Sequence, residues 1–285
     1  MKLSALSAAK YHHVLLFGAP KVGKTLLAGK LAEAGYTLDW FDLESGAGTL
    51  YQLSPEAQEN INVISLRDTP SYPIAIETVL KAVKGKVSIC AEHGKVNCPV
   101  CSKDSKPVEV IDMYNPPSRK HIYVFDSGTQ LMNSAIAHMR KGKAEDYKFE
   151  WDDWGHLGTL MGIFYSHIQN IPANVIVITH ETETEMEDGK IKLVPTGGTR
   201  NFSRGVAKHF DHVIYVDVKN RSHLAASSTT YSMNILTGSR SGVVLEDAAT
   251  PSLLDIFEGK VQSPQQKQVK AVASNLLKAA GVGVK

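Results

Sequence analysis

The sequence predicts an α/β fold in which a mainly parallel sheet is flanked by helices. Up to residue 180, apolar segments of strand length alternate with segments of helical periodicity. This alternation is typical of parallel strands joined by crossover helices. After residue 185, shorter strand candidates follow one another with turn-rich connections, which favours an antiparallel extension of the sheet.

Each predicted element is an apolar run or an amphipathic repeat bounded by turn residues. Strands are expected at 12–17, 37–43, 61–66, 121–126 and 174–180. Helices are expected between them at 24–35, 72–84, 129–140 and 155–170. The antiparallel strand candidates are 190–194, 212–218 and 231–236.

Changes in composition divide the chain into a core, an insertion and a tail. We expect an α/β core over residues 1–262, interrupted by an insertion at 86–118 that Gly85 and Pro116-Pro117 bound. Residues 263–285 predict a linker followed by a short amphipathic helix. That helix either packs on its own domain or contacts another protomer or a partner, and the sequence leaves both open.

Length and composition indicate a globular protein without a membrane span. The chain has 285 residues, of which 43% are hydrophobic, and a net charge of +2. This is enough apolar content for a core, and no apolar run reaches bilayer length. The first nine residues are too short and too weakly apolar for a secretory signal, so we expect a cytoplasmic protein. Because the net charge is small, any contact with nucleic acid must come from local basic segments.

The motif G-x-x-x-x-G-K-T at residues 18–25 is the most specific feature of the chain. It lies between a strand candidate and a helix candidate, the setting that a phosphate-binding loop requires. Its glycines let backbone N–H groups turn toward a triphosphate, while the helix presents its positive end. Lys24 is expected to reach the β- and γ-phosphates, and Thr25 to ligate Mg²⁺. The expected nucleotide-binding residues are Gly18, Ala19, Pro20, Lys21, Val22, Gly23, Lys24 and Thr25.

A second nucleotide-site element is the apolar strand 122–126, which ends in Asp126. An aspartate at this place holds the Mg²⁺ shell through water in P-loop proteins, although it could instead cap the following helix. Mg²⁺ keeps several waters and needs few protein ligands, so Thr25 and Asp126 suffice. No N-K-x-D guanine signature is present, and ATP is therefore the expected nucleotide.

All three cysteines lie within twelve residues, with a histidine among them. Cys90 and His93 form C-x2-H, and Cys98 and Cys101 form C-x2-C. Two such pairs supply the four tetrahedral ligands of a closed structural Zn²⁺ site. A disulfide is the main rival, but an odd cysteine count and a cytosolic setting argue against it. The lysines around the cluster leave open whether it contacts nucleic acid or is a solvated, metal-stabilised insertion.

Asp126 is followed by Ser127-Gly128 without a second acid, so a catalytic base must come from another strand. Two further strands end in polar side chains. The strand from residue 38 ends in Asp42 and Glu44, and the strand from residue 175 ends in Thr179-His180-Glu181. The order of these elements, with the P-loop and the helix at Trp154-Gly155, resembles a phage-encoded, AAA-type and RecA-like P-loop ATPase family associated with single-strand annealing and recombination. The resemblance spans about residues 10–260 without the cysteine insertion.

The resemblance implies a RecA-like core and roles for several of these side chains. Glu44 would be the general base that orients the attacking water, with Asp42 in support, and His180 or Thr179 would couple hydrolysis to a mobile loop. Acids at strand ends are also common in surface loops, and His180 could simply cap its strand. The cysteine cluster departs from RecA itself, as does the lack of its large C-terminal domain, which leaves strand exchange open.

The resemblance also implies that the segments after the Asp126 and His180 strands bind single-stranded DNA. Both carry cations beside aromatics, a combination that pairs with phosphates and stacks on bases, although acids dilute each segment. The second segment is expected to be a flexible loop. The candidate DNA-binding residues are Arg140, Lys141, Lys143, Arg200, Phe202 and Arg204.

Hydrolysis by such proteins often uses a cation from a neighbouring subunit, which would require a filament or ring. Lys219, Arg221 and Arg240 are candidates, and each could equally be a solvated loop cation. A single-strand-binding protein is a further candidate partner, and no membrane partner is expected. A phage-encoded protein would act in the host cytoplasm.

The sequence therefore predicts an ATPase that uses ATP, Mg²⁺ and structural Zn²⁺ and acts on single-stranded DNA in recombination or annealing. Two rival functions stay open. One is a small-molecule kinase for nucleosides or nucleotides, for which no clear arginine-rich lid is seen. The other is a DNA-interaction protein that binds a nucleotide without hydrolysing it.

Overall fold

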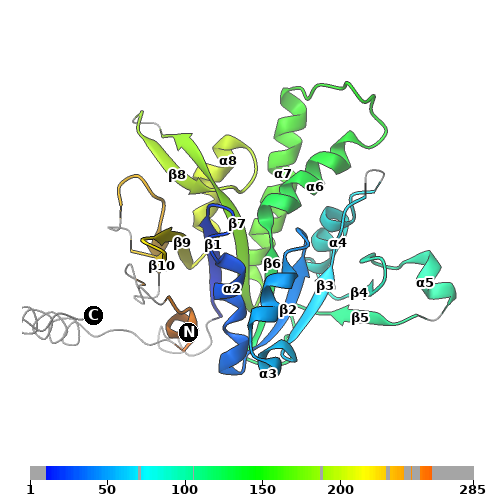
Figure 1. The fold of residues 1–285 in the computed structure, drawn as a ribbon. Coiled ribbons are helices and arrows are strands. Elements are labelled where there is room, and N and C mark those ends of the chain that lie inside the picture. The colour runs from blue at the N-terminus through cyan, green and yellow to red at the C-terminus, as the bar shows by residue number, and fades with distance from the viewer. Residues whose placement is uncertain are drawn as a thin grey trace, which may run out of the picture.

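The structure is a computed structural model with a mixed β-sheet at its centre. It describes residues 11–69, 72–104, 106–186, 189–228, 232–240, 245 and 251–258. Within these residues, nine strands form one sheet whose main path runs in the order β10-β9-β1-β7-β6-β2-β3 (Figure 1). Two further strands lie off this path, since β11 pairs with β9 and β8 pairs with β7.

The centre of this sheet is parallel, as predicted. All pairings among its six central strands are parallel. These strands are β1 (His13–Gly18), β2 (Thr37–Asp42), β3 (Ile61–Ser65), β6 (His121–Asp126), β7 (Asn174–Glu185) and β9 (His212–Lys219). The antiparallel additions are β8 (Ile191–Pro195), β10 (Ser222–Ala226) and β11 (Gly238–Ser239). The prediction of a mainly parallel sheet with an antiparallel extension is confirmed. The strand expected at 212–218 as part of that extension is instead β9, which pairs in parallel with β1 because the chain crosses over before it.

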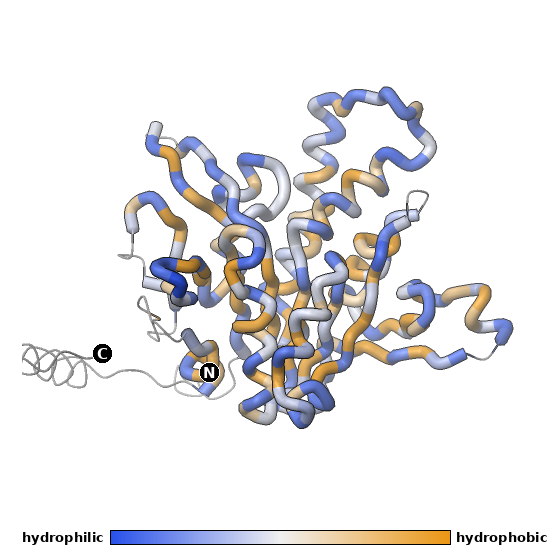
Figure 2. The backbone as a smooth tube through the Cα atoms, in the orientation of Figure 1, coloured by the Kyte–Doolittle hydropathy of each residue, from blue (hydrophilic) through white to orange (hydrophobic). Residues whose placement is uncertain are grey.

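Alternate residues of each central strand face two different cores. In β1, Leu15 and Phe17 belong to one core, while Val14 and Leu16 belong to the other. Because both faces are covered, β1 and the first half of β7 read as nearly continuous apolar runs. Figure 2 shows orange stretches at the centre of the sheet.

Helices cover both faces of the sheet. One face packs against α2 (Lys24–Gly29), α3 (Pro55–Gln58), α9 (Leu254–Phe257) and the 3-10 turns η1 (Ala32–Ala34) and η2 (Ala47–Gln52). The other packs against α4 (Ile74–Ala82), α6 (Gly128–Arg140), α7 (Trp151–Asn170) and η3 (Val206–His209). In Figure 1 the α6–α7 pair extends beyond the sheet as an arm, whose connection is residues 141–150.

The predicted insertion contains a small structure of its own. Strands β4 (Val87–Cys90) and β5 (Val108–Ile111) form a separate antiparallel pair, and α5 (Pro99–Lys103) lies between them in sequence. Ile89 and Ile111 are buried in the core beside α4, and Thr78 Oγ1 of α4 donates a hydrogen bond to Gly94 O at 2.8 Å. The hairpin is therefore anchored on the sheet-covering helices and not only tethered at its ends.

Several boundaries differ from the sequence predictions. The helix expected at 24–35 ends at Gly29, and the 3-10 turn η1 follows at Ala32–Ala34. Leu50 and Leu53 pack closely over Gly29, within 3.1 Å of where a Cβ would lie. The strand expected at 231–236 is wrong over its described part, which is a turn with one bridging residue, Ile235. The predicted tail at 263–285 lies outside the described residues. Among described helices, none combines the length and apolar character needed to cross a bilayer.

Candidate nucleotide site and metal centre

The candidate nucleotide site lies where four parallel strands end. The register sets Asp42 of β2 beside Asp126 of β6, and Asp126 beside Ile178 of β7. Gly18 at the end of β1 pairs with His180 of β7. Because parallel strands present their carboxyl ends at one edge, residues far apart in the sequence meet here.

The P-loop backbone depends on glycine at two positions. Gly18 has φ 153°, and a Cβ there would lie 2.1 Å from the carbonyl oxygen of Val216 on β9. Gly23 precedes α2 with φ 93°, and its Cβ would lie 2.9 Å from His223 Nδ1. A side chain at either place would displace backbone or close the loop, so the loop can form only with glycine at these positions.

Lys24 and Thr25 of the loop face Asp126. Lys24 Nζ donates hydrogen bonds to Gly18 O at 2.8 Å and Ala19 O at 2.6 Å. Burial lowers the pKa of Lys24 to about 8, while the nearby carboxylates of Asp126, Glu44 and Glu181 act in the opposite direction. Thr25 Oγ1 donates to Asp126 Oδ2 at 2.8 Å. The hydroxyl and carboxylate are thus adjacent oxygen donors of the kind that Mg²⁺ binds.

Asp126 is almost completely buried. Burial raises the pKa of its carboxyl to about 7, and Glu44 and Asp42 act in the same direction, while the Thr25 hydrogen bond and Lys24 lower it. A buried carboxylate surrounded by other carboxylates is a site with unsatisfied negative charge. This environment favours a bound cation.

Glu44 is held at the edge of the same pocket by side chains from two other strands. Its Oε1 accepts a short hydrogen bond from Ser127 Oγ and a second one from His180 Nε2 at 3.2 Å. Ser127 Oγ also caps α6 by accepting from Gln130 N, and His180 N donates to Thr129 Oγ1. Glu44 is therefore fixed through two groups that are themselves fixed by α6.

The pocket between these groups has a volume of about 370 Å³. It is open to solvent and lined mostly by polar residues. Its lining residues are Lys21, Gly23, Lys24, Thr25, Leu26, Glu44, Thr49, Gln52, Asp126, Ser127, Ile178, His180 and His223. Of the predicted loop residues, Gly18 and Ala19 contribute carbonyls to Lys24, and Pro20 is exposed.

Six pocket residues were not among the predicted site residues: Leu26, Thr49, Gln52, Ser127, Ile178 and His223. Thr49 and Gln52 come from η2, and His223 comes from β10, where its Nδ1 donates to Val22 O at 2.9 Å. His223 lies 201 residues from Val22 along the chain, and no motif connects the two. Only the antiparallel return of β10 beside β9 brings this imidazole onto the P-loop.

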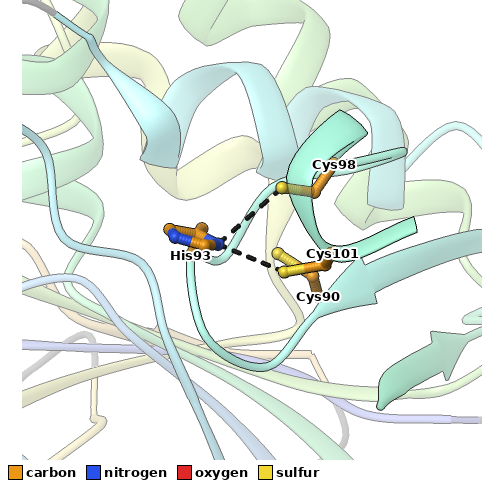
Figure 3. A group of neighbouring side chains, drawn as sticks. All are labelled: Cys90, His93, Cys98 and Cys101. Carbon is orange, nitrogen blue, oxygen red and sulfur yellow. Dashed lines mark hydrogen bonds between the residues drawn. The ribbon is translucent and has the colours of Figure 1, made fainter. Parts of the chain in front are cut away.

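The four predicted metal ligands meet at one point of the β4–β5 module (Figure 3). Donor atoms of Cys90, His93, Cys98 and Cys101 all lie within 4.8 Å of one another, and the three cysteines are buried. A tetrahedral Zn²⁺ site with metal–sulfur bonds of ~2.3 Å has donor atoms about 3.8 Å apart. The donor set and its compactness therefore fit zinc.

The backbone around the cluster is shaped to bring the ligands together. Cys90 N donates to Lys95 O, and Gly94 N donates to Cys90 O at 2.9 Å, which turns His93 back toward Cys90. Cys98 precedes α5, and backbone N–H groups of Cys101 and Val100 lower the pKa of its thiol to about 7. Burial raises the pKa of Cys101 to about 12, with Cys90 and Cys98 acting in the same direction. Three crowded thiols of this kind favour a metal that displaces their protons.

A model of an AAA domain family matches residues 10–241. The chain belongs to this family. The match covers the P-loop motif, Asp42, Glu44 and Asp126, and the cysteine–histidine cluster, and it supports a P-loop ATPase. A comparison with curated proteins gave no match.

Solved structures also resemble this AAA domain. One of them, described as the crystal structure of the RadB recombinase, is 15% identical, with a TM-score of 0.39 over 79% of this chain and 84% of that chain. At this identity the likeness assigns no activity to the present chain.

The first basic segment of the AAA domain lies at the end of the α6–α7 arm. Lys141 Nζ is 3.7 Å from Glu77 Oε1, and Lys143 Nζ is 2.7 Å from Asp153 Oδ1. Arg140 lies over the ring of Phe149 at 5.3 Å. The three predicted cations are therefore grouped, and two of them are partly neutralised by acids.

The second basic segment is not the flexible loop expected from the sequence. Residues Arg200–Gly205 form α8, which Thr199 caps by accepting from Phe202 N. Both arginines donate from Nε to Thr184 Oγ1 of β7, and Arg204 also donates to Glu185 O. Phe202 packs against Tyr165, with ring centroids 5.6 Å apart. The reason for the difference is this packing, which holds Phe202 against the core cluster, partly buried, so that it is not a free stacking ring.

The three cations considered as donors to a neighbouring subunit lie at opposite ends of the parallel strands. Lys219 and Arg221 lie at the β9–β10 turn, on the edge that carries the P-loop. Arg240 follows β11, which pairs with the first residues of β9. Its guanidinium donates to Lys208 O at 2.7 Å. Arg240 is therefore at the edge opposite to the nucleotide pocket of its own chain.

Proposed function

We propose that this AAA domain hydrolyses ATP and acts on single-stranded DNA, as a RecA-like protein of phage-type recombination or annealing. The observation that carries the hydrolytic part is the position of Glu44. Its carboxylate borders the pocket that holds Lys24, Thr25 and Asp126, and Ser127 and His180 hold it there.

Nucleotide binding follows from the P-loop groups. Lys24 would exchange its bonds to Gly18 and Ala19 carbonyls for the β- and γ-phosphate oxygens. Thr25 and Asp126 would hold Mg²⁺. When bound, Mg²⁺ neutralises negative charge on the phosphates. His223 and Gln52, at the mouth of the pocket, would contact the remainder of the nucleotide.

Hydrolysis requires a base that orients water in line with the γ-phosphate. Glu44 would accept the proton of that water, while Ser127 and His180 fix its carboxylate by donating to Oε1. Oε2 of Glu44 is then left for the water. His180 is therefore a positioning residue, and its place on β7 links the base to the antiparallel extension of that strand.

The DNA-binding part of the proposal is supported by the arm. Arg140, Lys141 and Lys143 are exposed beside aromatic rings, a combination suited to single strands. Arg200 and Arg204 would add contacts from the surface of α8, with Phe202 as their support. A homo-oligomer, ring or filament, would let Lys219 or Arg221 reach the γ-phosphate of a neighbour. A single-strand-binding protein remains a candidate partner, and the host cytoplasm the proposed location.

We further propose that the cysteine cluster holds one structural Zn²⁺. Four protein ligands complete a tetrahedral site and leave no open position for chemistry. The metal would fix the loop that carries His93 against α4 and the end of β3. Native mass spectrometry should find one zinc per chain in the wild-type protein and none after Cys101→Ser. A wild-type protein without zinc would exclude this role.

The test is ATP hydrolysis by the zinc-replete protein with and without single-stranded DNA. Wild-type turnover should rise on adding DNA, while Lys24→Ala should show none, and Glu44→Gln should bind ATP without hydrolysing it. Lys24-dependent turnover that is indifferent to DNA, with phosphate transferred to a nucleoside, would favour the rival kinase function. ATP binding without any wild-type turnover would favour the non-hydrolysing interaction protein.

A further inference from the structure

The ring of Tyr72 lies between the α6–α7 arm and the β4–β5 hairpin with its cysteine–histidine cluster, which we call the metal module. Lys95 Nζ lies 4.1 Å from the centroid of this ring, and Lys141 Nζ lies 4.5 Å from it. Lys95 belongs to the loop between the metal ligands His93 and Cys98. Lys141 directly follows α6. Two cations from segments 46 residues apart are thus gathered on one half-buried aromatic side chain.

The same pairing of cation and ring continues along the arm. Arg140 Cζ lies 5.3 Å from the Phe149 centroid, and Lys143 Nζ lies 3.9 Å from that of Tyr147. Trp154 packs on Phe149 with centroids 5.3 Å apart, and is still 42% exposed. Beyond it, Trp151 is 91% exposed. Large exposed rings beside cations are unusual on a surface that has no partner.

The series of cation–ring contacts begins, at its other end, beside a pocket of about 350 Å³ between β3 and the metal module. Arg67, which follows β3, and Lys95 lie on its wall with the hydroxyl groups of Ser65 and Thr69. His93 and Glu92 complete its polar lining. We call the line from this pocket through Tyr72 to the end of the arm the cation–aromatic track, which consists of Arg67, Lys95, Tyr72, Lys141, Arg140, Phe149, Lys143 and Tyr147.

The acids along the track do not cancel its charge. Glu77 accepts from Tyr72 OH at 2.6 Å and lies near Lys141 and His138, and Asp153 pairs with Lys143. Among the described residues, no carboxylate lies within ion-pair distance of Arg67, Lys95 or Arg140. These three cations are spread over the whole length of the track and are available to an anionic polymer.

We propose that the cation–aromatic track is the path of single-stranded DNA across this AAA domain, with the metal module forming one end of the binding surface. The inference rests on the proposed function and specifies its DNA site. Spaced cations would pair with successive phosphates. The exposed rings of Trp151 and Trp154, at the arm end of the track, would stack on unpaired bases. Duplex DNA has no free base faces for the rings, so the track selects single strands.

The place of the track gives the metal module a function beyond stability. Gly94 packs so closely that a Cβ there would lie 2.7 Å from Ser65 O and 2.9 Å from Leu66, so the loop between His93 and Cys98 is seated on the end of β3. Lys95 is adjacent to Gly94, and its position over Tyr72 therefore depends on that loop. Loss of the metal should weaken DNA binding as well as stability.

The experiment measures the fluorescence anisotropy of a labelled thirty-nucleotide oligothymidylate with full-length, zinc-replete protein and Mg²⁺-ATP. Lys95→Ala should reduce the slope of log affinity against log salt by ~0.7, the value for one lost phosphate contact on a single strand. Tyr72→Ala should weaken binding about tenfold, and Tyr72→Phe should retain it, because the ring alone holds the ammonium groups of Lys95 and Lys141 in place. The matched control is Lys30→Ala, which removes an exposed lysine beside α2 on the opposite face.

Tryptophan fluorescence supplies a second readout. Trp40 is buried, whereas Trp151 and Trp154 lie at the arm. Oligothymidylate should quench the wild-type emission, and Trp151→Phe should remove part of that quenching. The inference is overturned if the wild type binds DNA but Lys95→Ala and Tyr72→Ala match Lys30→Ala, or if duplex DNA binds as tightly as the single strand. A wild type that binds no DNA would instead refute the proposed DNA function itself.

Discussion

In the protein without nucleotide or Mg²⁺, the buried carboxyl of Asp126 should lower the free energy of unfolding. Asp126 is 3% exposed, and its pKa is raised from 3.8 to about 7, first by burial. Ionising this group in the folded state then costs about 4 kcal/mol, at ~1.4 kcal/mol for each tenfold change in proton affinity. Asp126→Asn removes that charge and can still accept the hydrogen bond from Thr25.

The sign of the pH dependence follows from the raised pKa. Between pH 3.8 and about 7 the folded carboxyl holds its proton while the unfolded one has lost it. Stability therefore falls as pH rises through this window, and the penalty is complete above pH 7. We expect Asp126→Asn to be more stable than the wild type by up to about 4 kcal/mol at pH 8. The gain should shrink to about 2 kcal/mol at pH 5.

The assay is urea or thermal unfolding of zinc-replete protein without Mg²⁺ or nucleotide, at pH 5 and pH 8. A gain of 4 kcal/mol corresponds to a rise in Tm of about 8 °C for a domain of this size. Asp146→Asn is the matched control, because it alters an exposed carboxyl in the arm connection. A variant that is no more stable than the wild type at pH 8, or whose gain is the same at both pH values, would refute the reasoning.

Three further predictions concern the P-loop, the base and the metal. Gly18→Ala should abolish ATP binding in calorimetry, because its Cβ would lie 2.1 Å from Val216 O; measurable binding would show that β9 can yield. His180→Ala should lower kcat about tenfold with KM for ATP unchanged, because Glu44 loses one of its two donors, whereas a raised KM alone would assign His180 to binding. Cys101→Ser should lose the metal and several kcal/mol of unfolding free energy, and equal stability of the zinc-replete wild type and the variant would contradict a structural metal.

Local patterns predicted most of the central sheet. The strands at 121–126 and 61–66 and the helix at 129–140 were placed within a residue or two of their observed bounds, because apolar runs and helical periodicity reflect burial on both faces of the sheet. The short strands β4, β5 and β10 were missed. They have few residues and mixed polarity, and they form only because the chain returns beside a neighbour.

The two basic segments show where composition is insufficient. Their cations and aromatics look alike in the sequence, and Phe149 and Phe202 are both partly buried against the same core. The fold, however, sets Arg140 over the ring of Phe149 and packs Phe202 against Tyr165. No sequence pattern marks Tyr72 as part of a binding surface. Its role follows only from the fold, which places Lys95 and Lys141 on its ring.

The sequence by itself determined the P-loop motif, the strand-end acids and the cysteine–histidine cluster, because each is a short motif recognisable from residue type and local spacing. The tertiary structure alone decided what surrounds them. It placed His223 on the P-loop, Ser127 and His180 on Glu44, and Arg240 at the far edge. These relations depend on strand order and register, which join residues separated by up to two hundred positions and leave no mark in any local pattern.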